Sequence, residues 1–180
     1  MDGYSFVELN EELLGKIRDQ WKAKIEALPD EAIDILWPTY QRTVGWCEKY
    51  VDPNQESGDL WLHVVVDGDG CPVALVELTN AHRAKDPSIK FLNIDLEPSS
   101  IMNLQDSVDQ ESLGKVLNVI MFAITSAFAI AINQVRKFKI YGRDDEIVSV
   151  FDALIAKHMN DPEQPFNIYR QQRWLVIEAV

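Results

Sequence analysis

Hydrophobic and polar residues change their spacing along the chain, and the changes divide it into strands and helices. Alternation of apolar and polar residues predicts strands, and apolar residues three or four positions apart predict helices. These patterns predict strands over residues 4–10, 60–66, 73–79, 89–97, 137–141, 166–169 and 173–178. They predict helices over residues 10–28, 30–47, 112–135 and 144–158. The predicted order is therefore β-α-α-β-β-β-α-β-α-β-β.

Several local signals set the expected boundaries. Asn10 is typical of a helix N-cap, and Asp144 or Asp145 has the same character before the last helix. Pro38 is expected to kink or divide the second helix because it lacks a backbone N–H. The turn sequence over 67–72 predicts a β-hairpin between the second and third strands.

Residues 116–135 form a stretch without a charged residue. Such a run is long enough to cross a membrane, but a helix apolar nearly all round can also be packed on both sides within a protein. Ala123, Ala127 and Ala131 recur every four residues and form a smooth stripe. Five polar residues interrupt the run, and they favour a buried helix that begins near Ser112. Membrane insertion of residues 116–135 is the alternative.

Composition describes an acidic protein of one domain, residues 1–180. Hydrophobic residues make up 47% and charged residues 26%, with 17 Lys and Arg against 29 Asp and Glu, a net charge of −12. This charge disfavours nucleic acid and anionic membranes as partners, and it suits a basic partner or a cationic substrate such as an amine. The acidic residues are spread along the sequence, which is typical of a solubility role.

Cysteines and histidines predict no metal site. Cys47 and Cys71 are far apart in sequence, so a reduced compartment is the simplest expectation and a single disulfide the alternative. His63, His82 and His158 are dispersed, and the acidic turn at 67–70 lacks the further ligands of a calcium loop. The N-terminus has no signal-peptide pattern, which favours a cytoplasmic protein.

The element order, the strand sequence Leu92-Asn-Ile-Asp-Leu-Glu-Pro98 and the closing helix, loop and strand pair resemble the GNAT-type N-acetyltransferase superfamily. The resemblance covers essentially the whole chain. It implies an α/β (α+β) fold with a mixed, mostly antiparallel central sheet of six to seven strands and about four flanking helices. It also implies acetyl-CoA as cofactor, with its pyrophosphate at the N-terminus of the charge-free helix, where free N–H groups and the helix dipole favour anions.

The family signature at that helix start is Gln/Arg-x-x-Gly-x-Gly/Ala, and this chain departs from it. Counted from Gln110, the two glycine positions hold Leu113 and Lys115. Counted back from Gly114, the first position holds Glu111 and the last holds Val116. A carboxylate at Glu111 opposes a pyrophosphate, and Lys115 compensates in part. If the protein is an enzyme, the resemblance assigns cofactor binding to Gln110, Ser112, Leu113, Gly114 and Lys115.

Acetyl transfer to an amine needs a base for the amine proton and an acid for the departing thiol. Glu77, Asp95 and Glu97 lie on predicted strands and are candidate bases, although exposed strand carboxylates are the more common interpretation. Where the family often places a tyrosine acid, this chain has Phe151. Tyr141 and Tyr169 are substitutes, and Tyr169 joins the three carboxylates as the catalytic candidates of an enzymatic protein.

These observations favour a diverged, non-catalytic GNAT-like domain that serves as an interaction or assembly protein. An acyl-CoA-dependent N-acyltransferase acting on an amine is the first alternative, and a membrane-active protein is the second. The general look of the chain also resembles small GNAT-like proteins carried by tailed phages among their virion genes, which implies a virion location if the protein is phage-encoded. A protein partner is expected, self-association into a homo-oligomer stays open, and Trp21, Trp37 and Trp46 on the first two helices are a candidate partner surface.

Overall fold

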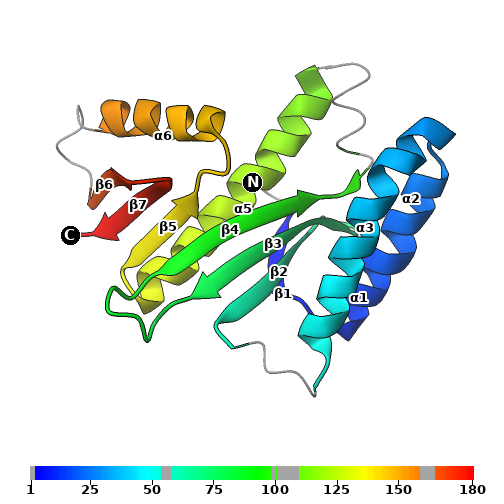
Figure 1. Ribbon diagram of the computed structural model, residues 1–180, viewed down its shortest axis with the longest axis horizontal. Helices are drawn as coiled ribbons and strands as arrows, with labels where there is room; N and C mark the ends of the chain where they lie inside the picture. Colours follow the sequence, from blue (N-terminus) through cyan, green and yellow to red (C-terminus); the bar gives the residue numbers. More distant parts are fainter. Residues whose placement is uncertain (1–2, 54–57, 99, 101–109, 159–164) are drawn as a thin grey trace. The chain divides into compact units, whose positions relative to one another are not determined.

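The computed structural model describes residues 3–53, 58–98, 100, 110–158 and 165–180 (Figure 1). The strands are β1 (Ser5–Glu8), β2 (Leu60–Val66), β3 (Pro72–Asn80), β4 (Ile89–Leu96), β5 (Lys137–Tyr141), β6 (Phe166–Gln171) and β7 (Trp174–Ala179). The helices are α1 (Glu11–Lys16), the π-helical segment η1 (Ile17–Trp21), α2 (Lys22–Glu26), α3 (Asp30–Val51), α5 (Gln110–Gln134) and α6 (Asp145–His158). The strand and helix order predicted from the sequence is confirmed.

The strands form one seven-stranded sheet in the order β1-β2-β3-β4-β5-β7-β6. β4 and β5 are parallel, with Ile89 opposite Phe138, whereas β1–β2, β5–β7 and β6–β7 are antiparallel. A parallel pair needs a crossover connection, and α5 lies in the connection between β4 and β5. The predicted mixed, mostly antiparallel sheet of six to seven strands is confirmed.

The chain forms two compact units. Unit 1 contains residues 1–77 and 94–123, and unit 2 contains residues 78–93 and 124–180. The prediction of a single domain over residues 1–180 stays a prediction.

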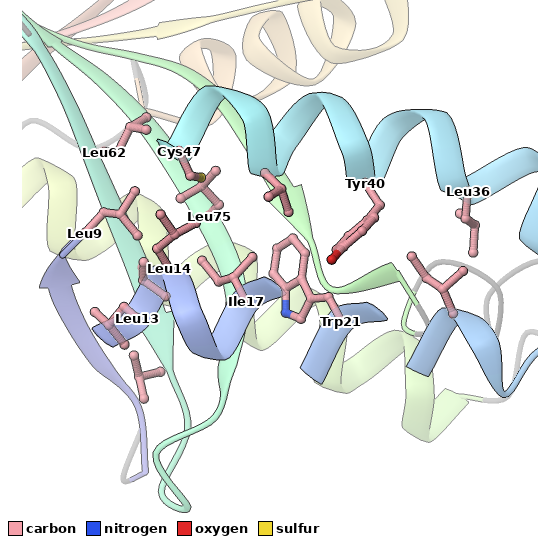
Figure 2. Close-up of a cluster of buried hydrophobic side chains, with 14 residues drawn as sticks. Leu9, Leu13, Leu14, Ile17, Trp21, Leu36, Tyr40, Cys47, Leu62 and Leu75 are labelled. Carbon is pink, nitrogen blue, oxygen red and sulfur yellow. The ribbon is translucent and has the colours of Figure 1, made fainter. Parts of the chain in front are cut away.

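The core of unit 1 forms where the first helices pack on the strands (Figure 2). Asn10 caps α1, because its side-chain oxygen accepts a hydrogen bond of 2.9 Å from the backbone N–H of Leu13. Trp21 is 2% exposed, and its indole N–H donates to the carbonyl of Pro72 at 2.8 Å. Burying the ring with its N–H satisfied avoids the cost of an unpaired polar group. The core also contains apolar residues of α1, η1, α3 and β2, including Leu13, Leu14, Ile17, Leu36, Cys47, Leu62 and Val64.

The second helix of the pattern, α3, is continuous from Asp30 to Val51 with Pro38 inside it. Pro38 therefore does not divide this helix, and the alternative expectation of a kink stays a prediction. Its buried face, which includes Leu36, Tyr40 and Val44, packs into the unit 1 core. Tertiary packing outweighs the cost of one missing helical hydrogen bond.

The charge-free stretch forms most of α5. Ala123, Ala127 and Ala131 are 0% exposed, as the four-residue spacing predicts. Ser112 lies inside the helix, so the prediction that the helix begins there was wrong; residues 101–109, which precede it, lie outside the described residues. The helix ends at Gln134, and Arg136 takes a left-handed φ of 60°. That conformation stops a helix before the strand that follows.

In the part of the chain that the structure describes, α5 is not covered on both sides. Leu113, Leu117 and Met121 are 37%, 50% and 49% exposed. Among the described residues, α5 is the one helix long and apolar enough to cross a membrane by length and composition, and 28% of its most apolar window is buried. Its buried face is the alanine stripe, and a large apolar face remains open to solvent.

Unit 2 contains a smaller core around β5. The Phe128 ring contacts Phe138 and Phe166 edge to face, with centroids 5.9 Å and 5.1 Å apart. Asp144 caps α6 by accepting from the backbone N–H of Ile147 at 2.9 Å, which confirms one of the two predicted caps. Gly142 ends β5 in a narrow space, because an added Cβ would lie 2.8 Å from a methyl of Val148.

Candidate functional site

A cavity of about 310 Å³ opens beside the first turns of α5, wholly within unit 1. It is lined by β-strand ends, the β2–β3 turn, α2 and α5: Tyr4, Lys24, Asp67, Val73, Leu96, Glu97, Ser100, Ser112, Lys115, Val116 and Val119. Its volume is near the lower end of the range for small-molecule sites, roughly 300–1,000 Å³. Two segments singled out by the sequence, the end of β4 and the start of α5, both line this cavity.

Glu97 is the buried ionisable group of this cavity. It follows the last residue of β4, and its backbone N–H donates to the carbonyl of Val73 at 3.0 Å. The residue is 3% exposed, yet its carboxylate lies 3.3 Å from the ammonium of Lys24 and accepts a hydrogen bond of 3.2 Å from the Ser100 hydroxyl. A buried carboxylate is tolerated when it is paired and hydrogen-bonded in this way. The prediction of an exposed strand carboxylate was wrong for Glu97.

The residues that the resemblance assigns to cofactor binding divide into two groups. Ser112 and Lys115 line the cavity. Gln110, Leu113 and Gly114 do not, and Gln110 and Leu113 are exposed. An added Cβ at Gly114 would meet nothing within 4 Å, so no close backbone approach within the protein requires a glycine there.

Glu77 and Asp95 belong to a different cluster of unit 1, under α3. The Thr43 hydroxyl donates to the Asp95 carboxylate at 3.1 Å. Burial, followed by the negative charge of Asp95, raises the pKa of the Glu77 carboxyl above its ordinary value. Burial and Asp95 also raise the pKa of the Cys47 thiol to about 12. Neither Glu77 nor Asp95 lines the cavity that contains Glu97.

Tyr169 lies in unit 2, so neither unit brings it together with the three carboxylates. Its hydroxyl donates to the Glu178 carboxylate at 3.2 Å. Glu178 also pairs with Lys137 at 3.0 Å, and Asp86 pairs with both Lys137 and Lys139 at 2.6 and 2.7 Å. Hydrogen bonds from the two lysines hold the pKa of the Asp86 carboxyl below its usual range. Through these contacts Tyr169 belongs to an ion-pair network on the sheet.

The described residues of the cavity do not fit the pyrophosphate of acetyl-CoA. The two lysines that line it are both paired, Lys24 with Glu97 and Lys115 with Glu111 at 2.8 Å. The Asp67 and Glu97 carboxylates also line the cavity, and an anionic ligand is disfavoured by both. In the register counted from Gln110, the two positions that the resemblance gives to glycine carry the side chains of Leu113 and Lys115. The cavity therefore contains one buried carboxylate, Glu97, paired with the ammonium of Lys24, and one exposed lysine, Lys115, next to the Glu111 carboxylate.

Of the sequence candidates, Glu97, Ser112 and Lys115 line this cavity, whereas its other lining residues, among them Lys24, Tyr4 and Asp67, were not candidates. Lys24 is a helix residue whose only sequence signal is its charge. Tyr4 and Asp67 come from the first strand and the hairpin turn, far from Glu97 in sequence. Among the described residues, no group of three or more His, Cys, Asp or Glu could hold a metal ion. Cys47 and Cys71 are free thiols, so they do not pair with each other.

Comparisons with known proteins give similarity in three-dimensional structure and none in sequence. No family model and no curated protein sequence matches the chain. Among solved structures, it is similar to a histone acetyltransferase HPA2 and related acetyltransferase from Corynebacterium glutamicum, with 11% identity, a TM-score of 0.46, and coverage of 99% of this chain and 98% of that chain. It is also similar to the spermidine/spermine N-acetyltransferase SpeG from Vibrio cholerae, with 14% identity, a TM-score of 0.41, and coverage of 98% and 89%.

A third similar structure is an acetyltransferase of the GNAT family from Staphylococcus aureus, with 12% identity, a TM-score of 0.36, and coverage of 97% and 98%. The chain has the GNAT-type element order and mixed sheet that the resemblance implied. At these identities and TM-scores, the likeness gives no information on activity, cofactor or substrate.

Proposed function

We propose that this protein is a non-catalytic GNAT-like domain that acts by binding a protein partner. The observation that carries the proposal is the α5 outer stripe, defined as Leu113, Leu117 and Met121. These side chains recur every four residues, so they lie on one face of the helix, and they are 37–50% exposed. A row of large apolar side chains on the surface of a soluble protein marks an interaction site more often than a row of polar ones does.

The misfit between the cavity and acetyl-CoA supports the non-catalytic part of the proposal. An enzyme of this fold needs its cofactor beside α5, where Lys115 is paired with Glu111 and the Glu97 carboxylate is paired with Lys24. The carboxylates of Glu97 and Glu111 beside the start of α5 oppose the pyrophosphate of a nucleotide cofactor.

Cross-linking from the stripe tests the proposal. A photo-reactive amino acid replaces Leu117 in the protein expressed in its native cells, and a matched protein carries it at exposed Glu48 on α3. We expect a discrete protein adduct from position 117 that is absent from position 48, and loss of the adduct when Met121 is changed to Glu. Absence of an adduct at position 117, or equal adducts at both positions, contradicts the proposal.

A lipid bilayer is the other partner that binds an exposed apolar stripe. The net charge of −12 repels anionic lipid, so flotation is best tested with vesicles of neutral lipid. If the native protein floats with the vesicles and Leu117→Glu does not, the binding partner of the stripe is a membrane and not a protein.

An acyl-CoA-dependent N-acyltransferase is the second candidate, because one cavity joins the Glu97 carboxylate with Ser112 and Lys115 of α5. Its test is release of free thiol from acetyl-CoA in the presence of a panel of primary amines. Amine-dependent release that Glu97→Gln abolishes would favour this candidate over the binding function.

A further inference from the structure

A second cavity of unit 1 lies between α2 and α3 and shares no residue with the one that contains Glu97. It has a volume of about 440 Å³ and is lined by Glu26, Ile33, Asp34, Trp37 and Pro38. We call it the α2–α3 groove. Three of its five residues are apolar and two are carboxylates, so it presents an apolar floor with two negative groups.

One backbone carbonyl of α3 next to the groove lacks its helical donor. Pro38 lies inside α3 and has no N–H, so the carbonyl of Asp34, four residues earlier, lacks the donor that an α-helix normally supplies. The Trp37 ring is held by Tyr40, whose ring centroid lies 5.3 Å away. An aromatic face beside carboxylate and carbonyl oxygens is a favourable environment for the cationic head and aliphatic stem of a lysine or arginine side chain.

The surroundings of the groove are acidic. Residues 26–41 contain four acidic side chains and no Lys, Arg or His: Glu26, Asp30, Glu31 and Asp34, all of them exposed. Glu26 is 3.7 Å from Lys22 in an exposed pair, which contributes little and can exchange for another cation. The groove thus faces solvent with an excess of negative charge.

The acidic charge of the chain is not evenly divided between its units. The residues of unit 1 include seven Lys and Arg against 21 Asp and Glu, whereas those of unit 2 include ten against eight. The acidic residues, although dispersed along the sequence, place most of the net negative charge in unit 1. Long-range attraction to unit 1 favours a basic partner and disfavours a second copy of this acidic chain.

We propose that the α2–α3 groove docks a basic segment of a protein partner, with a lysine or arginine side chain lying over Trp37 between Glu26 and Asp34. The inference rests on the proposed interaction function and gives the chemistry of one partner surface. Charge complementarity selects the basic segment, and the apolar floor selects one that carries an aliphatic side chain beside the cation.

Fluorescence anisotropy with a labelled peptide of alternating lysine and leucine tests the inference. Asp34→Asn removes one groove charge, and Glu48→Gln removes one exposed charge elsewhere on α3 as a matched control. We expect Asp34→Asn to weaken binding about three-fold or more and Glu48→Gln to leave it unchanged. Trp37→Ala is expected to weaken binding about ten-fold or more, with thermal unfolding used to establish that the variant is folded.

Three outcomes overturn the inference. The first is that Asp34→Asn and Glu48→Gln bind the peptide with the same affinity. The second is that a peptide of alternating glutamate and leucine binds as tightly as the lysine and leucine peptide. The third is that free butylamine competes as effectively as unlabelled peptide at equal amine concentration. A cross-link from Leu117 without peptide binding retains the proposed function and overturns this inference alone. Amine-dependent turnover of acetyl-CoA contradicts the proposed non-catalytic function, whether or not the peptide binds.

Discussion

The ammonium of Lys24 on α2 lies 3.3 Å from the carboxylate of Glu97 at the end of β4. The Glu97 side chain is 4% exposed and that of Lys24 is 45% exposed, so a cation at the surface neutralises a carboxylate in the interior. The pair connects the helical layer of unit 1 to its sheet.

Breaking this pair should destabilise the protein. Lys24→Met leaves Glu97 buried without its cation, and we expect a loss of about 1–2 kcal/mol in the free energy of unfolding, reduced because Lys24 is half exposed. Lys22→Met, in the exposed pair with Glu26, is the matched control and should change stability by less than about 0.5 kcal/mol. Urea denaturation measures both free energies of unfolding. Equal losses in the two variants would show that the Lys24–Glu97 pair contributes no more to stability than an exposed pair.

Glu77 should make stability depend on pH. Its pKa is raised by burial and by Asp95, so the folded protein binds the proton more tightly than the unfolded chain. Its stabilising contribution is therefore complete below the ordinary glutamate value and is lost as the pH rises through the raised value. We expect Glu77→Gln to be more stable than the native protein at pH 7 and to lose this advantage in acid. Thermal unfolding across pH measures the difference, and an effect of constant size at every pH would rule out this origin.

The two cysteines should differ in reactivity. Cys47 is 0% exposed and the pKa of its thiol is raised to about 12, so almost no thiolate is present at neutral pH. Cys71 is partly exposed. Mass spectrometry after iodoacetamide treatment should find Cys71 modified in the folded protein and Cys47 modified only in denaturant. Modification of Cys47 at the same rate as Cys71 without denaturant would contradict its placement in the core.

Two glycines should respond to alanine in opposite directions. A Cβ at Gly142 would lie 2.8 Å from Val148 and 3.0 Å from Phe151, so Gly142→Ala should cost about 1–3 kcal/mol through overpacking. Gly114 lies inside α5 with nothing within 4 Å, so Gly114→Ala should stabilise the protein by up to about 1 kcal/mol through helix propensity. Denaturation of the two variants side by side tests this, and a loss at position 114 would indicate an unseen close approach there.

The sequence predicted the fold better than it predicted the site. Strand alternation, the Asn10 cap and the alanine stripe of α5 are local signals, and the structure confirms each of them. Burial of Glu97 depends on Lys24, which lies more than seventy residues earlier, and no local pattern reports such a contact. Packing of α5 on one side only was missed for the same reason, because periodicity identifies a helix but not how many neighbours cover it.

Isothermal titration with acetyl-CoA tests the central claim, that a GNAT-type fold works here by binding a protein and not by acyl transfer. The carboxylates of Glu97 in the cavity and Glu111 in the first turn of α5 oppose a pyrophosphate, so we predict no saturable heat at millimolar acetyl-CoA. Stoichiometric binding by the native protein that Ser112→Asp abolishes would contradict the account, because it would place the cofactor beside the first turns of α5.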